Sequence, residues 1–352
     1  MNLSSNCAGC ILKPEPSVKK ICRLQTLWMI LLVSVPMINT SASERPELTV
    51  YTYSSFTSSW GPGPVLKEAF ESVCECQLNY VSSDDGVSLL NRLRLEGNRT
   101  RADVVMGIDH MLIPQMFSAE LVKQHHIDLE AFPLKPSLNW QDPYFVPFDY
   151  GYFAFIYDQE RIDNPVQSMQ ELIQSDATVI YQDPRTSTPG QGLMHWIQLL
   201  YQHEAVDAWR QLSQNTVTVT KGWSEAYAMF LQGEADYVLS YTTSPAYHQL
   251  VEEKEQYVAT IFSEGHLAQI EVAGVSAFSS QPELARQFLA FLLEADTQAM
   301  IAQHNWMLPV RSDVSLPDVF AEAERDTLWL APEEAEANRR DWLRVWRSAA
   351  GR

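Results

Sequence analysis

Apolar positions alternate or recur at helical spacing along most of the chain, and they predict strands that alternate with helices. Residues 47–53 (ELTVYTY) alternate in the manner of a strand, and residues 65–70 carry apolar side chains at the spacing of a helix. Strand-like residues 77–81, a helix start at residues 84–86 and strand-like residues 102–106 follow in order. This βαβαβ order predicts a mainly parallel sheet with helices on both faces.

Two long apolar runs interrupt this rhythm. Residues 145–157 (FVPFDYGYFAFIY) are aromatic and nearly uncharged, as expected of a strand buried on both faces, and residues 269–278 form a second strand-like run. Two such crossings predict one lobe inserted within another. We therefore expect an α/β protein in which lobe 1 comprises residues 44–147 and 274–352, and lobe 2 comprises residues 148–273.

Helical patterns dominate the C-terminal part of the chain. Residues 282–303 are predicted to be helical. Residues 332–347 predict a final helix, because acidic residues come first, basic residues come last, and Trp342 and Trp346 lie on one apolar stripe. Most of these tryptophans are therefore expected in the core.

The segment from Thr216 to His248 holds two strand-like runs that each end in an aromatic, hydroxyl-bearing loop. The first run leads into Trp223, and the second leads into a loop from Tyr241 to Tyr247. Ligands of open α/β sheets bind at the carboxyl ends of strands, which is where both loops lie. Packing of one lobe against the other would also explain any one of these aromatic residues, but the three together favour a ligand site.

Aromatic residues and one carboxylate recur at the predicted strand ends and helix starts. Aromatic faces attract an organic cation by about 0.5–2 kcal/mol each, and a carboxylate supplies the counter-charge. A flat, positively charged heterocycle fits this inventory. Asp85 would equally serve as a helix cap, and Trp60 is the weaker member of the set. The candidates are Tyr53, Trp60, Asp85, Trp223, Tyr241, Tyr247 and Trp306.

Composition and charge narrow the function. The 352 residues are 46% hydrophobic and 20% charged, which is typical of a folded soluble protein, and the formal net charge is −19. Such an acidic chain is a poor partner for nucleic acid. The patterns HExxH, GxxxxGK[ST], GxSxG and GxGxxG are absent from the sequence. No catalytic residue, metal ligand or cofactor site is therefore predicted.

The first 43 residues have the layout of a secretory signal. Basic residues precede the apolar run from Leu27 to Val35, and small residues follow at positions 40–43. This run is shorter than the roughly 20 residues that a membrane-spanning helix needs. We therefore expect cleavage after Ala42 or Ser43 and export of the remaining chain.

Three of the five cysteines lie within this predicted signal, so that Cys74 and Cys76 remain. In an oxidising compartment these two residues are expected to form a disulfide, with free thiols as the alternative. Two thiolates without a neighbouring histidine make a poor metal site.

Several long runs resemble the periplasmic thiamine-binding proteins of Gram-negative bacteria, which are the solute receptors of ABC importers. The runs include VYTYSSF, DDGVSLLNRLRLEG, FVPFDYGYFAFIYD, VIYQDPRTSTPGQGL, TVTVTKGWSEAY, VLSYTTSPAYH and NWM, in collinear order. The resemblance implies the two-lobed periplasmic binding protein fold (type II), in which each lobe is a mainly parallel sheet flanked by helices. It also implies lobes that close on thiamine or its phosphates by a hinge.

The resemblance also implies roles for individual residues. Asp85 and Gly86 are expected at the aminopyrimidine side of the ligand, and Ser187 and Thr188 at the phosphate end. From the residues alone, this second pair would be either an anion site or an ordinary helix cap. The remaining cleft residues are expected to be Trp223, Tyr241, Thr242, Thr243 and Ser244, with Tyr53, Tyr247 and Trp306 as aromatic walls.

Further consequences of the resemblance concern partners and location. The protein is expected to be a periplasmic monomer that delivers thiamine to an inner-membrane ABC permease with its cytoplasmic ATPase. Two alternatives of the same fold are a thiamine-degrading enzyme and a ferric-ion receptor. Cys74 and Cys76 lie outside any cleft motif, which argues against the enzyme. Tyr241 and Tyr247 lack the adjacent tyrosine pair expected of the iron receptor.

Overall fold

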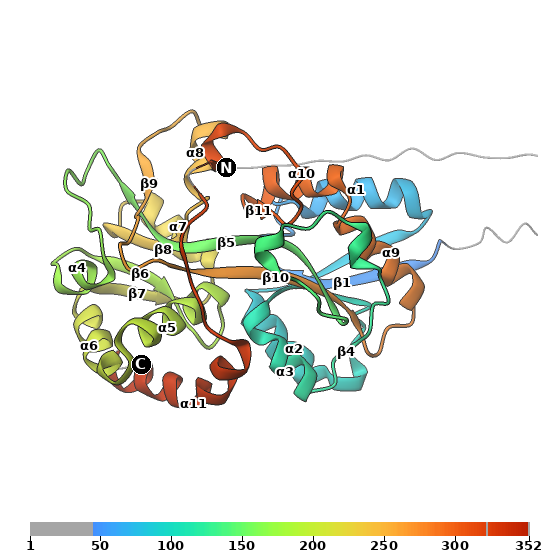
Figure 1. The fold of residues 1–352 in the computed structure, drawn as a ribbon, viewed down its shortest axis with the longest axis horizontal. Coiled ribbons are helices and arrows are strands. Elements are labelled where there is room, and N and C mark those ends of the chain that lie inside the picture. Colours follow the sequence, from blue (N-terminus) through green and yellow to red (C-terminus); the bar gives the residue numbers. More distant parts are fainter. Residues whose placement is uncertain (1–44, 322, 351–352) are drawn as a thin grey trace, which may run out of the picture. The chain divides into compact units, whose positions relative to one another are not determined.

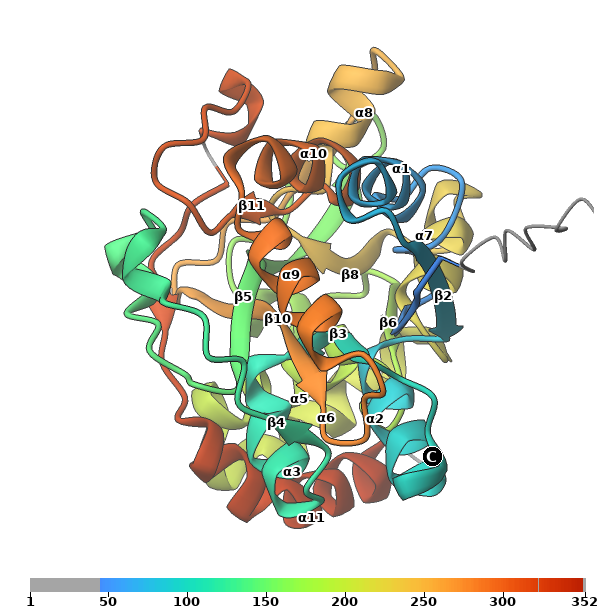
Figure 2. The same cartoon turned by 90° about the vertical axis from the view of Figure 1, so that its right-hand side faces the viewer.

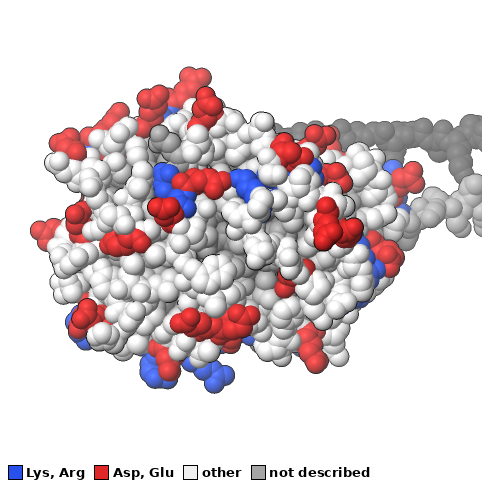
Figure 3. Space-filling model, viewed as in Figure 1, with Lys and Arg blue, Asp and Glu red and all other residues white. Residues whose placement is uncertain are grey.

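A computed structural model describes residues 45–321 and 323–350 (Figure 1). The predicted signal peptide at residues 1–43 lies outside the described residues. Among those that are described, no helix combines the length and apolar character needed to cross a membrane. Acidic side chains are spread over the face shown in Figure 3, whereas lysines and arginines gather in a few places.

Three parallel strands form one side of a long mixed sheet. β1 pairs with β2 on one edge and with β3 on the other, so that Tyr53 lies opposite Ser83 and Val50 lies opposite Val104. These strands and the helices that follow them are called the first half. Its elements are β1 (Glu47–Tyr53), α1 (Gly63–Cys74), β2 (Gln77–Ser83), α2 (Gly86–Glu96), β3 (Val104–Asp109) and α3 (Ile113–Ser118).

Three further parallel strands form the other side, in which β6 pairs with both β7 and β8. These strands and their helices are called the second half. Its elements are α4 (Met169–Gln174), β6 (Val179–Gln182), α5 (Thr188–Tyr201), α6 (Ala205–Asn215), β7 (Thr216–Thr220), α7 (Trp223–Leu231), β8 (Tyr237–Tyr241) and α8 (Pro245–Val251). The helix α7 begins at Trp223 itself.

Two antiparallel strands, β5 (Phe145–Asp158) and β10 (His266–Ser276), join the two halves. They run side by side through the middle of the molecule, as Figures 1 and 2 show. β10 pairs with β3 of the first half, and β5 pairs with β8 of the second. All fourteen residues of β5 are buried, which explains its apolar sequence. The two predicted crossings are thus present.

Shorter elements complete the described chain. The segment predicted as one helix over residues 282–303 is two helices, because the chain leaves the helical path at Leu293 and Glu294. The remaining strands and helices are β4 (Val122–Lys123), β9 (Tyr257–Ala259), α9 (Pro282–Leu292), α10 (Ala295–Asn305), β11 (Leu308–Pro309), β12 (Thr327–Leu328) and α11 (Pro332–Ala349). Short 3-10 turns are η1 (Gly97–Arg99), η2 (His110–Leu112), η3 (Leu129–Ala131), η4 (Pro136–Leu138), η5 (Gln202–Glu204) and η6 (Asp318–Phe320).

The C-terminal helix α11 belongs mainly with the second half. Its Trp346 is fully buried and donates from Nε1 to Tyr181 Oη at 3.1 Å. The helix packs on α6 and α5 of the second half, and it also packs on η2 and α3. The predicted lobe boundaries assign this helix to lobe 1, and they stay a prediction; the α/β fold class and its mainly parallel halves are confirmed.

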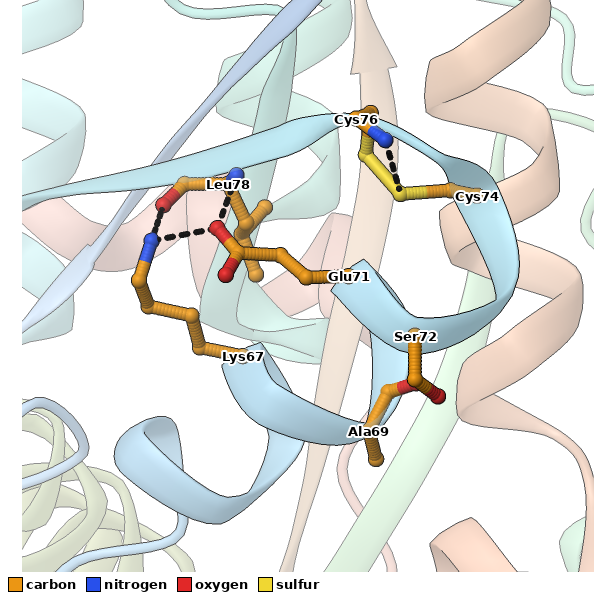
Figure 4. The surroundings of a disulfide bond; sticks show 7 residues. All are labelled: Lys67, Ala69, Glu71, Ser72, Cys74, Cys76 and Leu78. Carbon is orange, nitrogen blue, oxygen red and sulfur yellow. Dashed lines mark hydrogen bonds and ion pairs between the residues drawn. A yellow bond between two sulfur atoms is a disulfide. The ribbon is translucent and has the colours of Figure 1, made fainter. Parts of the chain in front are cut away.

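A disulfide links Cys74 and Cys76 where α1 turns into β2 (Figure 4). The same turn is held by Glu71, whose carboxylate accepts from the backbone N–H of Leu78 at 2.7 Å and from Lys67 Nζ at 2.6 Å. Lys67 also donates to the carbonyl oxygen of Leu78. The predicted disulfide is therefore present, but neighbouring contacts share its structural role.

We expect the double substitution of Cys74 and Cys76 by serine to lower the free energy of unfolding by only about 1–2 kcal/mol, because the bond closes a very short loop. Thermal unfolding of the variant and of the oxidised protein measures this difference. Reduction of the wild type should give a similar loss. A loss of 4 kcal/mol or more would show that the disulfide holds more than its own turn.

Candidate functional site

A cavity of about 350 Å³ lies between the two halves, beside the crossing strands. Its walls come from the carboxyl ends of β1 and β8, from the N-terminal ends of α5 and α7, and from the end of α10. The lining residues are Tyr53, Ser55, Trp60, Asp85, Thr188, Pro189, Trp223, Ser224, Tyr227, Ala228, Leu231, Tyr241, Ser244, Tyr247, Gln269, Glu271, Asn305, Trp306 and Met307.

Most of the residues predicted for the site line this cavity. They are Tyr53, Asp85, Thr188, Trp223, Tyr241, Ser244, Tyr247 and Trp306, together with the weaker candidate Trp60. The structure therefore brings the predicted aromatic residues to one place. Their contact with a ligand stays a prediction.

Four predicted residues lie behind the lining instead. Gly86 packs so closely on Thr188 that an added Cβ would lie 2.4 Å from Thr188 Oγ1. The hydroxyl groups of the other three face protein atoms: Ser187 donates to Asp85, Thr242 donates to the carbonyl oxygen of Ala323, and Thr243 points to the sulfur of Met307. These residues shape the cavity wall from behind.

Trp223 forms the centre of one aromatic wall. Its ring stacks on Tyr227 with centroids 4.9 Å apart and an interplanar angle of 22°, and Trp60 of the first half lies 6.1 Å away. The indole Nε1 donates to Ser240 Oγ at 2.7 Å, and Ser240 Oγ in turn lies 2.7 Å from Ser244 Oγ. The indole is thus fixed by both stacking and a hydrogen bond.

Replacing Ser240 by alanine should therefore weaken ligand binding by about 1 kcal/mol, because the indole N–H loses its buried partner. Calorimetric titration with the ligand that the family resemblance implies measures the change. Ser72→Ala is the matched control, since Ser72 is exposed on α1 and donates only to a carbonyl of its own helix. Equal affinities of the two variants would contradict a positioning role for Ser240.

Tyr247 and Trp306 form a second aromatic wall, with ring centroids 5.4 Å apart and nearly perpendicular planes. Trp306 ends α10 in the left-handed backbone region, with φ of 56°. That conformation is rare for a bulky residue. It persists only where surrounding contacts hold the residue in place. Here the indole stacks parallel on Phe320 with an interplanar angle of 3°. The chain thus turns sharply after α10 and presents this ring at the cavity.

Asp85 is the main tie between the two halves beside the cavity. Its Oδ1 accepts from the backbone N–H of Gly86 at 2.7 Å and of Thr188 at 3.0 Å. Its Oδ2 accepts from Ser187 Oγ at 2.7 Å and from the backbone N–H of Trp223 at 3.3 Å. One carboxylate thus joins the N-terminal ends of α2, α5 and α7, where helix dipoles favour negative charge.

The contacts of Asp85 indicate how its carboxylate acts in this conformation. Burial raises its pKa, while the hydrogen bonds from Thr188, Ser187, Gly86 and Trp223 oppose that shift. Because protein donors already engage both oxygens, the carboxylate acts as a helix cap and interhalf tie in this conformation. It supplies negative potential to the cavity without a free oxygen that faces a ligand.

Further contacts extend this tie along the rim. Ser88 of α2 donates from both its backbone N–H and its hydroxyl to the carbonyl oxygen of Thr186. Asn91 donates to the carbonyl oxygen of Arg185. The two halves are therefore in direct contact along one edge of the cavity.

An acidic cluster on the crossing strands forms the polar part of the wall. Glu271 of β10 accepts from Tyr53 Oη at 2.7 Å and from Gln269 Nε2 at 2.9 Å. Asp149 of β5 accepts from Asn305 Nδ2 at 2.6 Å. None of the lining residues is lysine or arginine. Among the residues that the structure describes, no cluster of His, Cys, Asp and Glu is arranged to hold a metal ion.

Sequence reasoning missed Glu271, Asp149, Gln269 and Asn305. The available signal was a carboxylate in the interior of each of the two mainly apolar crossing strands. A carboxylate there carries a large desolvation cost unless it has partners, which marks the position as unusual. It does not tell which partners the fold supplies.

Comparisons with known proteins agree on one kind of protein. The family model described as "Bacterial extracellular solute-binding protein" matches residues 63–299. The thiamine-binding periplasmic protein of Escherichia coli strain K12 is 50% identical over 328 residues, which cover 92% of this chain and 98% of that protein. A solved periplasmic thiamin binding protein superposes with a TM-score of 0.84 at 51% identity, covering 88% of this chain and 97% of the other.

More distant structures share the fold alone. The apo ferric ion-binding protein A of Pasteurella haemolytica superposes with a TM-score of 0.72 at 14% identity, covering 86% of this chain and 97% of that one.

Proposed function

The chain belongs to the thiamine-binding periplasmic proteins within the bacterial extracellular solute-binding proteins, and we propose that it captures thiamine in the cavity between its two halves. The protein is a solute-binding protein and not an enzyme. In the proposed function, the bound thiamine is handed to an inner-membrane ABC permease.

The chemistry of the cavity is the observation that supports this ligand most strongly. Thiamine carries a permanent positive charge on one flat ring and an amino group on a second ring. The cavity offers aromatic faces from Trp223, Tyr227, Tyr247 and Trp306, together with the carboxyl group of Glu271. Aromatic faces and an acidic wall without a competing lysine or arginine suit such a cation.

The volume of the cavity also suits a small ligand. At about 350 Å³ it lies at the lower end of the range of roughly 300–1,000 Å³ that is usual for small-molecule sites. Thr188 and Pro189 at the start of α5 line one end, where the helix dipole favours an anion. The backbone N–H of Thr188 already donates to Asp85 and Pro189 has no N–H, so the hydroxyl group of Thr188 is the donor that these two residues offer. We propose that phosphate esters of thiamine place their phosphate there, although the hydroxyl of Ser187 is engaged by Asp85.

Calorimetric titration with thiamine, thiamine monophosphate and thiamine diphosphate tests the function. Saturable binding of at least one of them is expected. Absence of binding by all three would overturn the proposal. Stronger binding of a phosphate ester than of thiamine would support the phosphate end at α5, and weaker binding would remove it.

We further propose that the protein works as a monomer in the periplasm after loss of residues 1–43. The crossing strands β5 and β10 would then act as the hinge about which lobe 1 (44–147 and 274–352) and lobe 2 (148–273) close, with the helix α11 staying on lobe 2, against which Trp346 packs. Small-angle scattering with and without thiamine tests both statements, because closure reduces the radius of gyration and the forward scattering reports the mass.

A further inference from the structure

Two carboxyl groups meet at the wall of the cavity, on the two strands that cross between the halves. Glu271 of β10 lies directly opposite Asp149 of β5 in the antiparallel register. Both residues are buried, with relative exposures of 6% and 0%. Glu271 reaches the cavity surface, whereas Asp149 lies behind it.

The hydrogen bonds around this pair leave one carboxylate oxygen without a donor. Both oxygens of Glu271 accept, one from Tyr53 and the other from Gln269. Asp149 Oδ2 accepts from Asn305, but Asp149 Oδ1 is buried and receives no hydrogen bond from an N–H or hydroxyl group. An unpaired, fully buried carboxylate oxygen is costly, and a proton shared with the neighbouring carboxyl group removes that cost.

Apart from His110, the ionisable groups around the pair are acidic or phenolic. Tyr53 comes from β1, Tyr241 from β8, and Asp85 from the start of α2. Asp109 of β3 lies opposite Glu271 on its other edge and is paired with His110 Nδ1 at 2.7 Å. The amide side chains of Gln269 and Asn305 are neutral. No lysine or arginine among the lining residues offsets the two carboxyl groups.

We propose that Glu271 and Asp149 hold a shared proton when the cavity is empty and release it when a cationic ligand enters, so that ligand capture is coupled to proton release. This inference rests on the proposed function, since it takes thiamine as the cation. The balance is simple: the ligand brings one positive charge, the pair loses one proton to the solvent, and the pair becomes fully ionised as the counter-charge.

The direction of the pKa shifts in the empty cavity agrees with a proton held by the pair. Burial raises the pKa of Asp149 to about 7. Burial, followed by the charge of Asp149, raises the pKa of Glu271 well above its usual range. Two interacting carboxyl groups titrate as one unit, so the raised pKa belongs to the pair. A positive ring beside Glu271 lowers it, because the opposite charge favours the ionised form.

The direction of the pH dependence follows. Below the pKa of the pair in the empty protein, binding must displace a proton, and affinity therefore rises with pH. The slope approaches about one decade in affinity per pH unit when one proton leaves. Above that pKa the pair is already ionised, and the slope falls to zero.

Calorimetry of thiamine binding in buffers of different ionisation enthalpy measures the proton count directly. Titrations at pH 6.5 in two such buffers should show the wild-type protein releasing up to about one proton per ligand. Glu271→Gln should abolish most of this release, and Asp149→Asn should do the same. Glu234→Gln is the matched control, because Glu234 is exposed in the second half and should leave the release unchanged.

Subtracting the number of protons released by Glu271→Gln from the number released by the wild type removes the contribution of any proton that the ligand itself exchanges. Thiamine binding without proton release by the wild type between pH 6 and 8 would overturn the inference while leaving the proposed function intact. Release that persists unchanged in both variants would overturn it as well. Absence of thiamine binding at every pH would instead overturn the proposed function, and the inference with it.

The stability of the empty protein gives a second readout that needs no ligand. A carboxyl pair whose folded pKa lies above its unfolded value stabilises the protein at low pH, and this contribution is lost as pH rises through the folded pKa. The melting temperature of the wild type relative to Glu271→Gln should therefore fall as pH rises from about 5 to 8. A constant difference over that range would contradict the shared proton.

Discussion

Asp85→Asn is expected to weaken thiamine binding by about 2–4 kcal/mol, the largest effect of any single change that we predict. The amide nitrogen that replaces one carboxylate oxygen cannot accept the hydrogen bonds that Oδ2 now receives from Ser187 and the backbone N–H of Trp223. The N-terminal end of α7 then loses its tie to the first half. A conformation with separated halves then becomes more populated. The apparent affinity for thiamine falls in proportion to the fraction of molecules that keep the binding-competent conformation.

Calorimetry measures the affinity, and amide hydrogen exchange at Thr188 and Trp223 reports the tie itself. Faster exchange at both positions is expected in the variant without ligand. Asp84→Asn is the matched control. The carboxylate of Asp84 is exposed and forms a long ion pair with Lys221, at 3.4 Å. Its loss should therefore change the affinity for thiamine by less than about 0.5 kcal/mol. Equal effects of the two substitutions would show that Asp85 is not the tie.

Trp223→Ala should weaken thiamine binding by about 1–3 kcal/mol, through lost ring stacking and cation–π contact. The loss should exceed that of Ser240→Ala, because removal of the ring also removes the partner on which Tyr227 stacks. Calorimetry again provides the measurement, and Trp223→Phe should recover part of the loss.

Trp329→Ala serves as the control for Trp223→Ala. Trp329 is 74% exposed and does not line the cavity, so its removal should leave thiamine affinity unchanged. Wild-type affinity of the Trp223→Ala variant would remove Trp223 from the site, and with it the main support for an aromatic cavity.

Local patterns in the sequence were enough to predict most of the longer strands, the two crossings and most of the aromatic lining. Trp223 lies three residues after the end of β7, and Tyr241 is the last residue of β8. Parallel strands end at a common edge, so the proximity of these two residues follows from general rules of α/β sheets. Tyr53 was predicted for the same reason. The family resemblance then supplied the ligand, which the ring positions alone left as an unnamed cation.

The acidic pair could not be predicted in this way. Asp149 and Glu271 are more than a hundred residues apart, and their proximity depends on the register between β5 and β10. That register is shifted by an irregularity directly after Glu271. A shift of one residue would turn a side chain to the opposite face of the sheet, so apolar pattern alone could not place the two carboxyl groups together.

Only part of the role of Asp85 could be predicted from the sequence, for a related reason. Its place before an apolar helical run indicates a helix cap, and the structure confirms the cap on α2. Its bonds to Ser187, Thr188 and Trp223 join segments a hundred or more residues away. Such bonds depend on how the two halves meet, which no local pattern specifies.

The tie formed by Asp85 also has a kinetic consequence. In the proposed function, opening of the two halves requires the start of α2 to separate from the starts of α5 and α7, and the contacts of Ser88 and Asn91 break with it. We therefore expect the residence time of the ligand to depend on how often this cluster of bonds opens, in addition to the strength of the ring contacts. A transporter that receives the protein would have to supply the work of breaking these bonds before the solute is released.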